Sequence, residues 1–443
     1  MSKITFMGAG STVFAKNVLG DTMLRPALSD FDIALYDIDE ARLQESYDMV
    51  CLLNKNINGG KARVEKYLGA ANRRDALRGA DFVVNAIQVG GYDPCTIADF
   101  EIPKKYGLRQ TIADTLGIGG IFRALRTIPV LEGFAEDMAA VCPNALFMNY
   151  TNPMGMLTGY MLRYTDIRTI GLCHSVQVCT KRLLENLGME PKGPVLEKIA
   201  GINHMAWLLE LRDADGNDLY PEVRRRAAAI LADPSLAVRE KPDLVRLEYV
   251  RRLGYYCTES SEHNAEYNNF FIKSKYPELI DRYKIPLDEY PRRCIDQIEK
   301  WKKDREGYLS GEITHELSRE YASNIMESIV TDTPFQIGGN VLNTGLITNL
   351  PHNACVEVPC LVNRRGILPT VVGDLPEICA AMNRTNVNVQ LLTIEAAATR
   401  KKEVLYQAAM MDPHTSAELS IDDIVALCDD LLEAHRDWMP TYN

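Results

Sequence analysis

Short apolar runs alternate with helix-like stretches through the first 190 or so residues, and this alternation limits the possible folds most strongly. Parallel strands have to be joined by long crossover connections, which are usually helices. Alternation of this kind therefore predicts an α/β domain whose parallel sheet is covered by helices on both faces. The expected buried strands are Ile4–Met7, Ile33–Tyr36, Phe82–Ile87, Ala145–Met148 and Arg168–Leu172.

The pattern changes after about residue 195, where helical, charge-rich segments replace the regular alternation. We therefore predict an α/β, Rossmann-like parallel-sheet domain over residues 1–195 and a mixed α+β domain over residues 196–443. No long linker separates the two, so we expect an extensive interface, where ligand sites of α/β proteins often form. In the second part we expect strands at Met205–Leu211, Val341–Ile347 and Val356–Val358, a hairpin turn at Asp213–Asn217, and helices over the final 70 or so residues.

A glycine-rich turn follows the first expected strand. The run Gly8-Ala9-Gly10-Ser11 opens a helix, and Asp37 stands at the end of the second strand. Small residues let the backbone approach a pyrophosphate, the helix N-terminus attracts its charge, and an acidic side chain can bind the ribose hydroxyls. The third glycine position holds Val13, and Asp37 or Asp39 could instead cap the next helix. This pattern predicts NAD rather than NADP, and by itself it favours a dehydrogenase.

Composition excludes several classes of protein. The chain has 49 Lys and Arg against 60 Asp and Glu, a net charge of −11, which argues against a nucleic-acid binder. No apolar run is long enough to span a bilayer, and the strand-like start at Ile4 leaves no room for a signal peptide. Eleven cysteines without a framework spacing indicate free thiols. We expect a cytoplasmic protein that does not bind membranes.

A thiol and an imidazole follow predicted strands in the middle of the chain. Cys173 comes directly after Arg168–Leu172, and His204 stands 31 residues later at the start of another expected strand. Strand ends at the carboxyl edge of a sheet face the ligand crevice, so the two side chains can converge there. Such a pair, completed by substrate or water oxygens, suits an open site for a borderline divalent metal. The alternative is that both are packed core residues.

Three other polar segments are candidates for the same crevice. Asn149 and Asn152 follow an expected strand and could orient sugar-like hydroxyls, or simply form a turn before Pro153. Asp114 precedes a glycine-rich stretch and could be a helix cap or an acid over the crevice. The segment Tyr255–His263 concentrates titratable groups and is either a solvated turn or part of the site.

Taken together, these motifs resemble the NAD- and manganese-dependent glycosidases of glycoside hydrolase family 4. The resemblance runs from Gly8 to at least Cys360, and within the family it is strongest to the melibiase-type α-galactosidases. The motifs that carry it are Gly8-Ala9-Gly10-Ser11, Tyr36-Asp37-Ile38-Asp39, Asn85–Tyr92, Asp114-Thr115-Leu116-Gly117, Ala124–Pro129, Asn149–Pro153, Gly171–Ser175, Gly201–His204, Thr258–His263 and Val356-Glu357-Val358-Pro359.

The resemblance implies a mechanism that differs from the usual pair of carboxylates in glycosidases. NAD would take a hydride from C3 of the sugar, and the resulting ketone would acidify the proton on C2. A base would remove that proton while the metal stabilises the negative charge. The bond from C1 to the leaving oxygen would then break with help from an acid, water would add, and NADH would return the hydride.

The resemblance also assigns roles by position. Cys173 and His204 would bind Mn²⁺, Asn152 would hold the sugar diol with His174 beside it, and Asp114 would be the general acid. To stay protonated, Asp114 would need a raised pKa. The implied contacts to the cofactor come from Gly8, Gly10, Ser11, Asp37, Gln88 and Asn149.

The C2 base is not fixed by the resemblance. Family members place an Asp or a Tyr on the matching loop, and the register here falls on Ser260. A serine hydroxyl has an unsuitable pKa, so we predict Glu259 as the base, with His263 replacing a cation of the relatives. Members specific for phosphosugars carry an Arg near the fourth strand, whereas this chain has the anionic Asp93 in that stretch, which favours an unphosphorylated sugar.

The sequence therefore predicts an α-galactosidase that acts on terminal α-galactosides in small oligosaccharides or glycosides. The alternatives within the family are an α-galacturonidase, α-glucuronidase or α-glucosidase. An alternative of another class is an NAD-dependent 2-hydroxy-acid dehydrogenase, and a third is a non-enzymatic nucleotide sensor. The resemblance further implies a homodimer or homotetramer.

Overall fold

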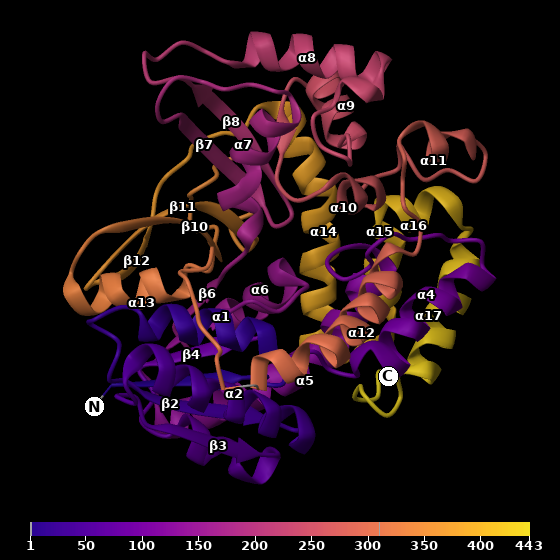
Figure 1. Cartoon of the computed structure of the whole chain (residues 1–443). Helices are drawn as coiled ribbons and strands as arrows, with labels where there is room; N and C mark the ends of the chain where they lie inside the picture. The colour runs from indigo at the N-terminus through magenta and orange to yellow at the C-terminus, as the bar shows by residue number, and fades with distance from the viewer. Residues whose placement is uncertain (1, 310) are drawn as a thin grey trace.

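The computed structural model describes residues 2–309 and 311–443 of the chain, and within them a 12-stranded sheet runs through the molecule (Figure 1). Its order is β3-β2-β1-β4-β5-β6-β10-β11-β7-β8-β9, and β12 pairs with β11. The strands are β1 (Lys3–Met7), β2 (Asp32–Asp37), β3 (Val64–Leu68), β4 (Phe82–Asn85), β5 (Leu146–Asn149), β6 (Thr169–Gly171), β7 (Leu196–Ile202), β8 (Met205–Arg212), β9 (Tyr256–Cys257), β10 (Phe335–Leu342), β11 (Cys355–Asn363) and β12 (Gly366–Pro369).

The part of the sheet from β3 to β6 is parallel throughout, as the alternation of strands and helices predicts. Its order is that of a dinucleotide-binding Rossmann fold. β1, β4 and β5 are almost wholly buried because both faces of this sheet are covered. The predicted α/β fold class is confirmed. The sequence reading missed β3, an edge strand whose polar Glu65 and Lys66 give it no continuous apolar run.

The remaining strands pair antiparallel and continue the same sheet. β10 joins β6 through the pair Asn340 and Gly171. It begins six residues before the predicted strand at Val341–Ile347, since its first half contains two glycines that resemble a turn. A Cβ on Gly339 would lie 2.9 Å from side-chain atoms of both Ile170 and Cys360, so glycine at this position lets β10 pack closely against them.

The hairpin of the second part is also different from the predicted one. β8 pairs with the preceding strand β7 and turns at Asn203 and His204. The predicted turn at Asp213–Asn217 closes only an isolated bridge between Arg212 and Asp218. His204 therefore lies in a tight turn between two antiparallel strands and directly precedes β8, so the predicted strand at Met205–Leu211 is confirmed.

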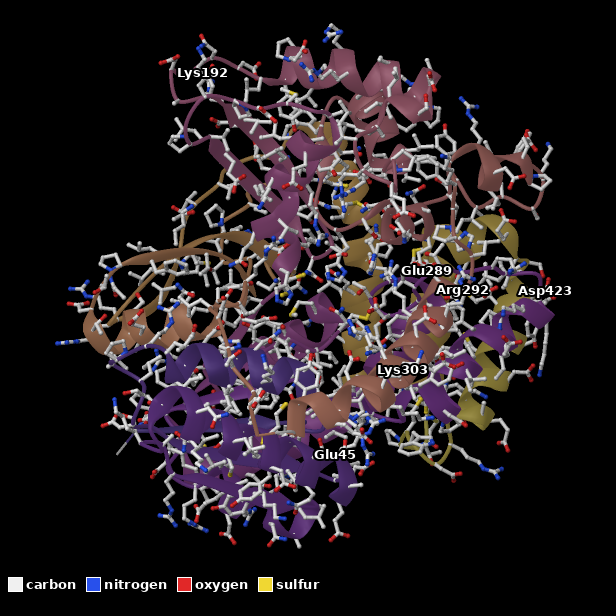
Figure 2. The ribbon with its side chains drawn as sticks, viewed as in Figure 1. Glu45, Lys192, Glu289, Arg292, Lys303 and Asp423 are labelled. Carbon is white, nitrogen blue, oxygen red and sulfur yellow. The ribbon has the colours of Figure 1, made fainter. Side chains whose placement is uncertain are left out.

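Helices surround the sheet and connect its two ends. The long helix α14 packs against α5, α6, α15 and β7, and Figure 1 shows it rising from the parallel part toward the hairpin. Helix α12 runs from the α10 region to α2, as the labels of Glu289, Lys303 and Glu45 in Figure 2 show. The helices are α1 (Thr12–Met23), α2 (Glu40–Asn58), α3 (Arg73–Leu77), α4 (Ile97–Lys105), α5 (Gly117–Val141), α6 (Met154–Tyr164), α7 (His174–Asn186), α8 (Tyr220–Ala232), α9 (Leu244–Leu253), α10 (Ser261–Glu266), α11 (Glu278–Arg282), α12 (Glu289–Leu309), α13 (Ala322–Thr331), α14 (Glu377–Thr399), α15 (Lys402–Met411), α16 (Pro413–Glu418) and α17 (Ile421–Ala434), with the short turns η1 (Ala70–Asn72), η2 (Gly91–Thr96) and η3 (Pro234–Leu236).

None of these helices, in the part of the chain that the structure describes, combines the length and the apolar character that a bilayer crossing requires.

Candidate active site

The turn between β1 and α1 has the geometry that a dinucleotide needs. Gly8 adopts a φ of +85°, and a Cβ there would lie 2.8 Å from the backbone of Ala86 and Ile87 after β4. Glycine is therefore required at this position. Ser11 precedes α1 and makes no capping bond with its side chain, so the first N–H groups of the helix are available to a phosphate.

Asp37 ends β2 beside this turn. Its carboxylate accepts hydrogen bonds from the backbone N–H of Gly10 at 2.6 Å and of Ile38 at 2.8 Å. Asp39, not Asp37, caps α2 by accepting from the N–H of Arg42. The cap interpretation of Asp37 is therefore wrong, and its carboxylate lies beside the turn between β1 and α1.

The two amides predicted to touch the cofactor have different surroundings. Gln88 is exposed on the loop after β4, with its amide 3.4 Å from Thr96. Asn149 is completely buried, and it bonds to Asn85, Thr151 and Thr158. The Asn149 side chain thus joins the ends of β4 and β5, and the geometry gives no support for a contact to the cofactor.

Cys173, His204 and Glu259 converge at one edge of the sheet. Ligand atoms of the three side chains all lie within 4.8 Å of one another. Cys173 follows β6, His204 lies in the turn between β7 and β8, and Glu259 stands between β9 and α10 with a φ of +70°. A sulfur, an imidazole nitrogen and a carboxylate oxygen form a donor set that suits Mn²⁺ or another borderline divalent cation.

Two hydroxyl groups lie beside Nδ1 of His204, the ring nitrogen away from Glu259, and orient the ring. Its Nδ1 lies 3.1 Å from the hydroxyl of Thr115 and 3.4 Å from that of Tyr267, while Nε2 lies 3.8 Å from Glu259. Burial lowers the pKa of His204, but the neighbouring Cys173 and Glu259 outweigh it and raise the pKa to about 10. The ring therefore lies beside a thiol and a carboxylate, groups that bind divalent cations as imidazole does. Sequence reasoning did not identify Thr115 or Tyr267.

Asp114 lies on the buried loop between α4 and α5. It accepts from Thr115 at 2.7 Å and from the amide of Asn152 at 3.3 Å, and it lies 3.8 Å from Nε2 of His263. The cap alternative is wrong, because Leu116 occupies the cap position of α5. Burial raises the pKa of Asp114, yet the charges of His263 and Arg123 lower it overall. The raised pKa expected for a free-standing acid is therefore not found.

Ser260 and His263 form a unit at the start of α10. The Ser260 hydroxyl caps the helix by accepting from the His263 N–H and lies 2.9 Å from Nδ1 of the same ring. Burial lowers the pKa of His263 although Glu259 and Asp114 raise it. The geometry thus gives Ser260 a role in orienting His263 rather than in taking a proton from a sugar.

Asn152 and His174, predicted to lie together at the sugar, have different neighbours in the structure. The Oδ1 atom of Asn152 is buried without a hydrogen-bond partner, so it can accept from a ligand hydroxyl. His174 begins α7, and its Nε2 lies 2.6 Å from the carboxylate of Glu320. Sequence reasoning missed Glu320, which precedes α13 and carries no motif.

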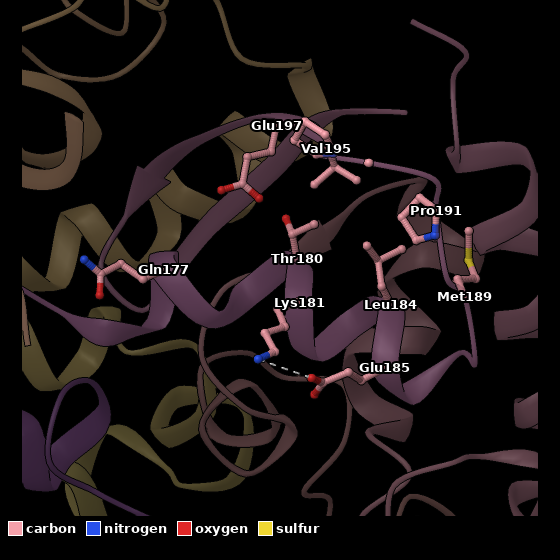
Figure 3. A pocket seen from close by; sticks show the side chains of 11 residues that line it. Gln177, Thr180, Lys181, Leu184, Glu185, Met189, Pro191, Val195 and Glu197 are labelled. Carbon is pink, nitrogen blue, oxygen red and sulfur yellow. Dashed lines mark ion pairs between the residues drawn. The ribbon is translucent and has the colours of Figure 1, made fainter. Parts of the chain in front are cut away.

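A groove lies on the outer side of α7, apart from these residues (Figure 3). It has a volume of about 460 Å³ and is lined by α7 and the loop that leads into β7, including Lys181 paired with Glu185. None of the predicted site residues lines it. The groove therefore does not belong to the cluster around Cys173 and His204.

Comparison with known proteins agrees with these features. A sequence model of family 4 glycosyl hydrolases matches residues 3–189, and a model of the C-terminal domain of that family matches residues 199–415. The chain is 61% identical to an α-galactosidase of Bacillus subtilis over 100% of both chains. It is 32% identical to an α-galactosidase of Rhizobium meliloti over 99% of this chain and 89% of that protein.

A solved structure supports the same fold. The 6-phospho-β-glucosidase of Thermotoga maritima, crystallised with manganese, NAD⁺ and glucose-6-phosphate, matches with a TM-score of 0.76. The two are 23% identical, and the match covers 99% of this chain and 100% of the other. On the strength of the family models and the sequence identities, the chain belongs to glycosyl hydrolase family 4.

Proposed function

We propose that the protein is an α-galactosidase that uses NAD and a divalent cation such as Mn²⁺ to hydrolyse terminal α-galactosides. The observation that carries this proposal is the convergence of Cys173, His204 and Glu259 at the sheet whose parallel part holds the nucleotide-type turn at Gly8. The 61% identity to the α-galactosidase of Bacillus subtilis supports the choice of sugar.

The residues present fit both groups. The turn at Gly8, the open helix start after Ser11 and the carboxylate of Asp37 would hold NAD. Cys173 and His204 would hold the cation. When bound, NAD would supply a reversible hydride acceptor, and the cation would stabilise the negative charge that develops when the sugar loses a proton.

Glu259 accepts the proton from C2 of the sugar. Burial raises its pKa, but the charges of His263 and His204 lower it overall, so it is a carboxylate ready to take a proton. Its Oε2 faces His204 at 3.8 Å and its Oε1 faces His263 at 3.6 Å. One oxygen therefore lies on the cation side, and the other is directed away from it.

Asp114 delivers a proton to the leaving oxygen, with His263 at 3.8 Å as its proton source. Burial lowers the pKa of His263, so its imidazolium gives up a proton to Asp114 more readily than a free imidazolium would. Asn152 holds the sugar through its amide group and its unpartnered Oδ1, next to the same carboxylate. The three side chains thus act on the same sugar.

We also propose a cytoplasmic homodimer or homotetramer, in which residues 1–195 bind NAD and contribute Cys173 to the cation site, and residues 196–443 contribute His204 and the oligomer contacts. All eleven cysteines are free thiols, which suits a reducing compartment. The acidic Asp93 after β4, in a stretch without Lys or Arg, favours an unphosphorylated sugar. Light scattering on the purified chain measures the oligomeric state.

The test is hydrolysis of p-nitrophenyl α-galactoside with NAD, Mn²⁺ and a thiol reductant. We expect nitrophenol release that requires the cation and produces no net NADH. In D₂O, the galactose formed should carry deuterium at C2. Absence of release from α-galactoside, α-galacturonide and α-glucoside would refute the proposal, and NADH accumulation with 2-hydroxy acids would indicate the dehydrogenase instead.

A further inference from the structure

A buried carboxylate outside the candidate cation site holds the loop that carries Asp114. Glu266, the last residue of α10, is only 2% exposed. Its Oε2 accepts from the backbone N–H of Thr111 at 2.7 Å and of Ile112 at 3.2 Å, and its Oε1 accepts from that of Ala113 at 2.8 Å. Three successive N–H groups thus converge on one carboxylate, as in the anion-binding nests of other loops.

Burying the Glu266 carboxylate costs folding free energy unless its hydrogen bonds hold another part of the chain in place. Burial raises the pKa of Glu266 to about 7, although the bonds from Thr111 and Ala113 lower it. In the described part of the chain no Lys or Arg forms an ion pair with it, so neutral hydrogen-bond donors, most of them backbone N–H groups, compensate its charge. Ala113 has a φ of +52°, a strained conformation for a non-glycine residue that persists only where neighbouring bonds impose it.

Further bonds hold the same loop from two sides. The Thr111 hydroxyl donates to the carbonyl of Glu262 in α10 at 2.7 Å. At the start of α12, the N–H of Asp288 donates to Gln110 and that of Tyr290 donates to Thr111. The loop is therefore clamped between α10 and α12, and Glu266 supplies the charged part of the clamp.

The clamp fixes the distance between two site residues. Asp114 follows directly after the last N–H that Glu266 holds, and His263 lies one helical turn before Glu266 on α10. The Glu266 bonds thus attach the loop of Asp114 to the helix of His263. Asp114 Oδ1 and His263 Nε2 lie 3.8 Å apart as a result.

We propose that Glu266 is a positioning residue, which holds Asp114 against His263 and the leaving oxygen of the substrate. The inference rests on the proposed role of Asp114 as proton donor. Glu266→Gln preserves the shape but turns one acceptor oxygen into an NH₂ group that meets a backbone N–H. The loop must then shift, and misplacement of a reacting group by about 1 Å lowers rates about 100-fold.

Two substrates with different leaving groups distinguish a loss of Asp114 positioning from a general loss of stability. Nitrophenolate leaves with little protonation, whereas the alkoxide of an α-galactosyl disaccharide needs a proton. For E266Q we expect kcat to fall about 10- to 100-fold on the disaccharide and less than about threefold on the nitrophenyl galactoside. D114N should show the same pattern more strongly. Equal losses on both substrates, or no loss on either, would overturn the proposal.

The matched control is Glu248→Gln. Glu248 is another buried glutamate, on α9, and its carboxylate pairs with Arg251 and Arg252. E248Q should alter both substrates by the same small factor. A leaving-group dependence in E248Q equal to that in E266Q would count against a specific role of Glu266.

Hydrogen exchange tests the clamp without any catalysis. In the wild-type full chain, the amides of residues 111–113 should exchange as slowly as those in the middle of α5. In E266Q they should exchange at least about tenfold faster while α5 is unchanged. Fast exchange at 111–113 in the wild type overturns the proposal even if E266Q fails to fold. If the wild type cleaves neither glycoside, the proposed function fails, and this measurement still decides the clamp.

Discussion

At the scale of single residues, a side chain that orients a proposed metal-binding residue can be tested as directly as the metal-binding residue itself. The Thr115 hydroxyl lies 3.1 Å from Nδ1 of His204 and donates to Asp114. Thr115→Val keeps the shape but removes this support. We expect the Mn²⁺ concentration for half-maximal hydrolysis to rise about 10- to 100-fold, measured by metal titration. Thr393→Val, a buried threonine that bonds within α14, is the control. Equal Mn²⁺ dependence in both variants would contradict the assignment.

The sequence predicted the convergence of Cys173 and His204 better than the side chains that support them. Cys173 and His204 stand beside recognisable strands, and their types alone suggest a metal. Tyr267 reaches His204 from 63 positions away, and no local pattern marks it. For Asn149 the sequence predicted a contact to the cofactor that the geometry does not support. A carboxamide at a strand end gives the same sequence pattern whether it faces a ligand or forms all its hydrogen bonds inside the protein.

At the scale of elements, the turn between β1 and α1 offers the clearest test of nucleotide binding by mutation. A Cβ on Gly8 would lie 2.8 Å from the backbone after β4, whereas Gly79 shares a positive φ but has open space around it. Gly8→Ala and Gly79→Ala should both lose about 1 kcal/mol or more of unfolding free energy through strain. Gly8→Ala alone should weaken NAD binding at least about tenfold, by isothermal titration. Equal NAD affinity in the two variants would refute a special role for this turn.

The elements of the parallel part followed from sequence because each strand there is a short apolar run. β3 did not, since an edge strand exposed on one side carries polar residues. The start of β10 did not either, because Gly338 packs closely against Val176 and Gly339 against Ile170, and neither forms a turn. Local pattern cannot distinguish these two uses of glycine.

At the scale of the whole molecule, a buried ion cluster joins the C-terminal helices to the first part. Asp99 of α4 binds Arg126 of α5 through both carboxylate oxygens, at 3.1 and 2.6 Å, and His435 after α17 at 2.9 Å. Asp99→Asn leaves the buried Arg126 without a counter-charge. We expect it to lower the free energy of unfolding by about 3–5 kcal/mol at pH 7, measured by urea denaturation.

The pKa of Asp99 makes the loss of unfolding free energy in D99N depend on pH in a predictable way. Burial raises the pKa of Asp99, but Arg126 and His435 outweigh it and lower the pKa below the unfolded value of about 3.9. The stabilisation is therefore complete above about pH 4 and is lost as pH falls through the folded pKa. The difference between wild type and D99N should shrink accordingly. The exposed Asp75→Asn should change stability by less than about 0.5 kcal/mol, and a D99N deficit independent of pH would contradict the account.

The path of the sheet from β6 through β10 and β11 to β7 has an evolutionary consequence. Cys173 follows the first of these strands and His204 the last, so ladder hydrogen bonds, not the intervening chain, fix their separation. Insertions or deletions after α7 can accumulate in related chains without moving either donor. The register of four strands, and not the 31-residue interval, therefore sets the distance between the two side chains.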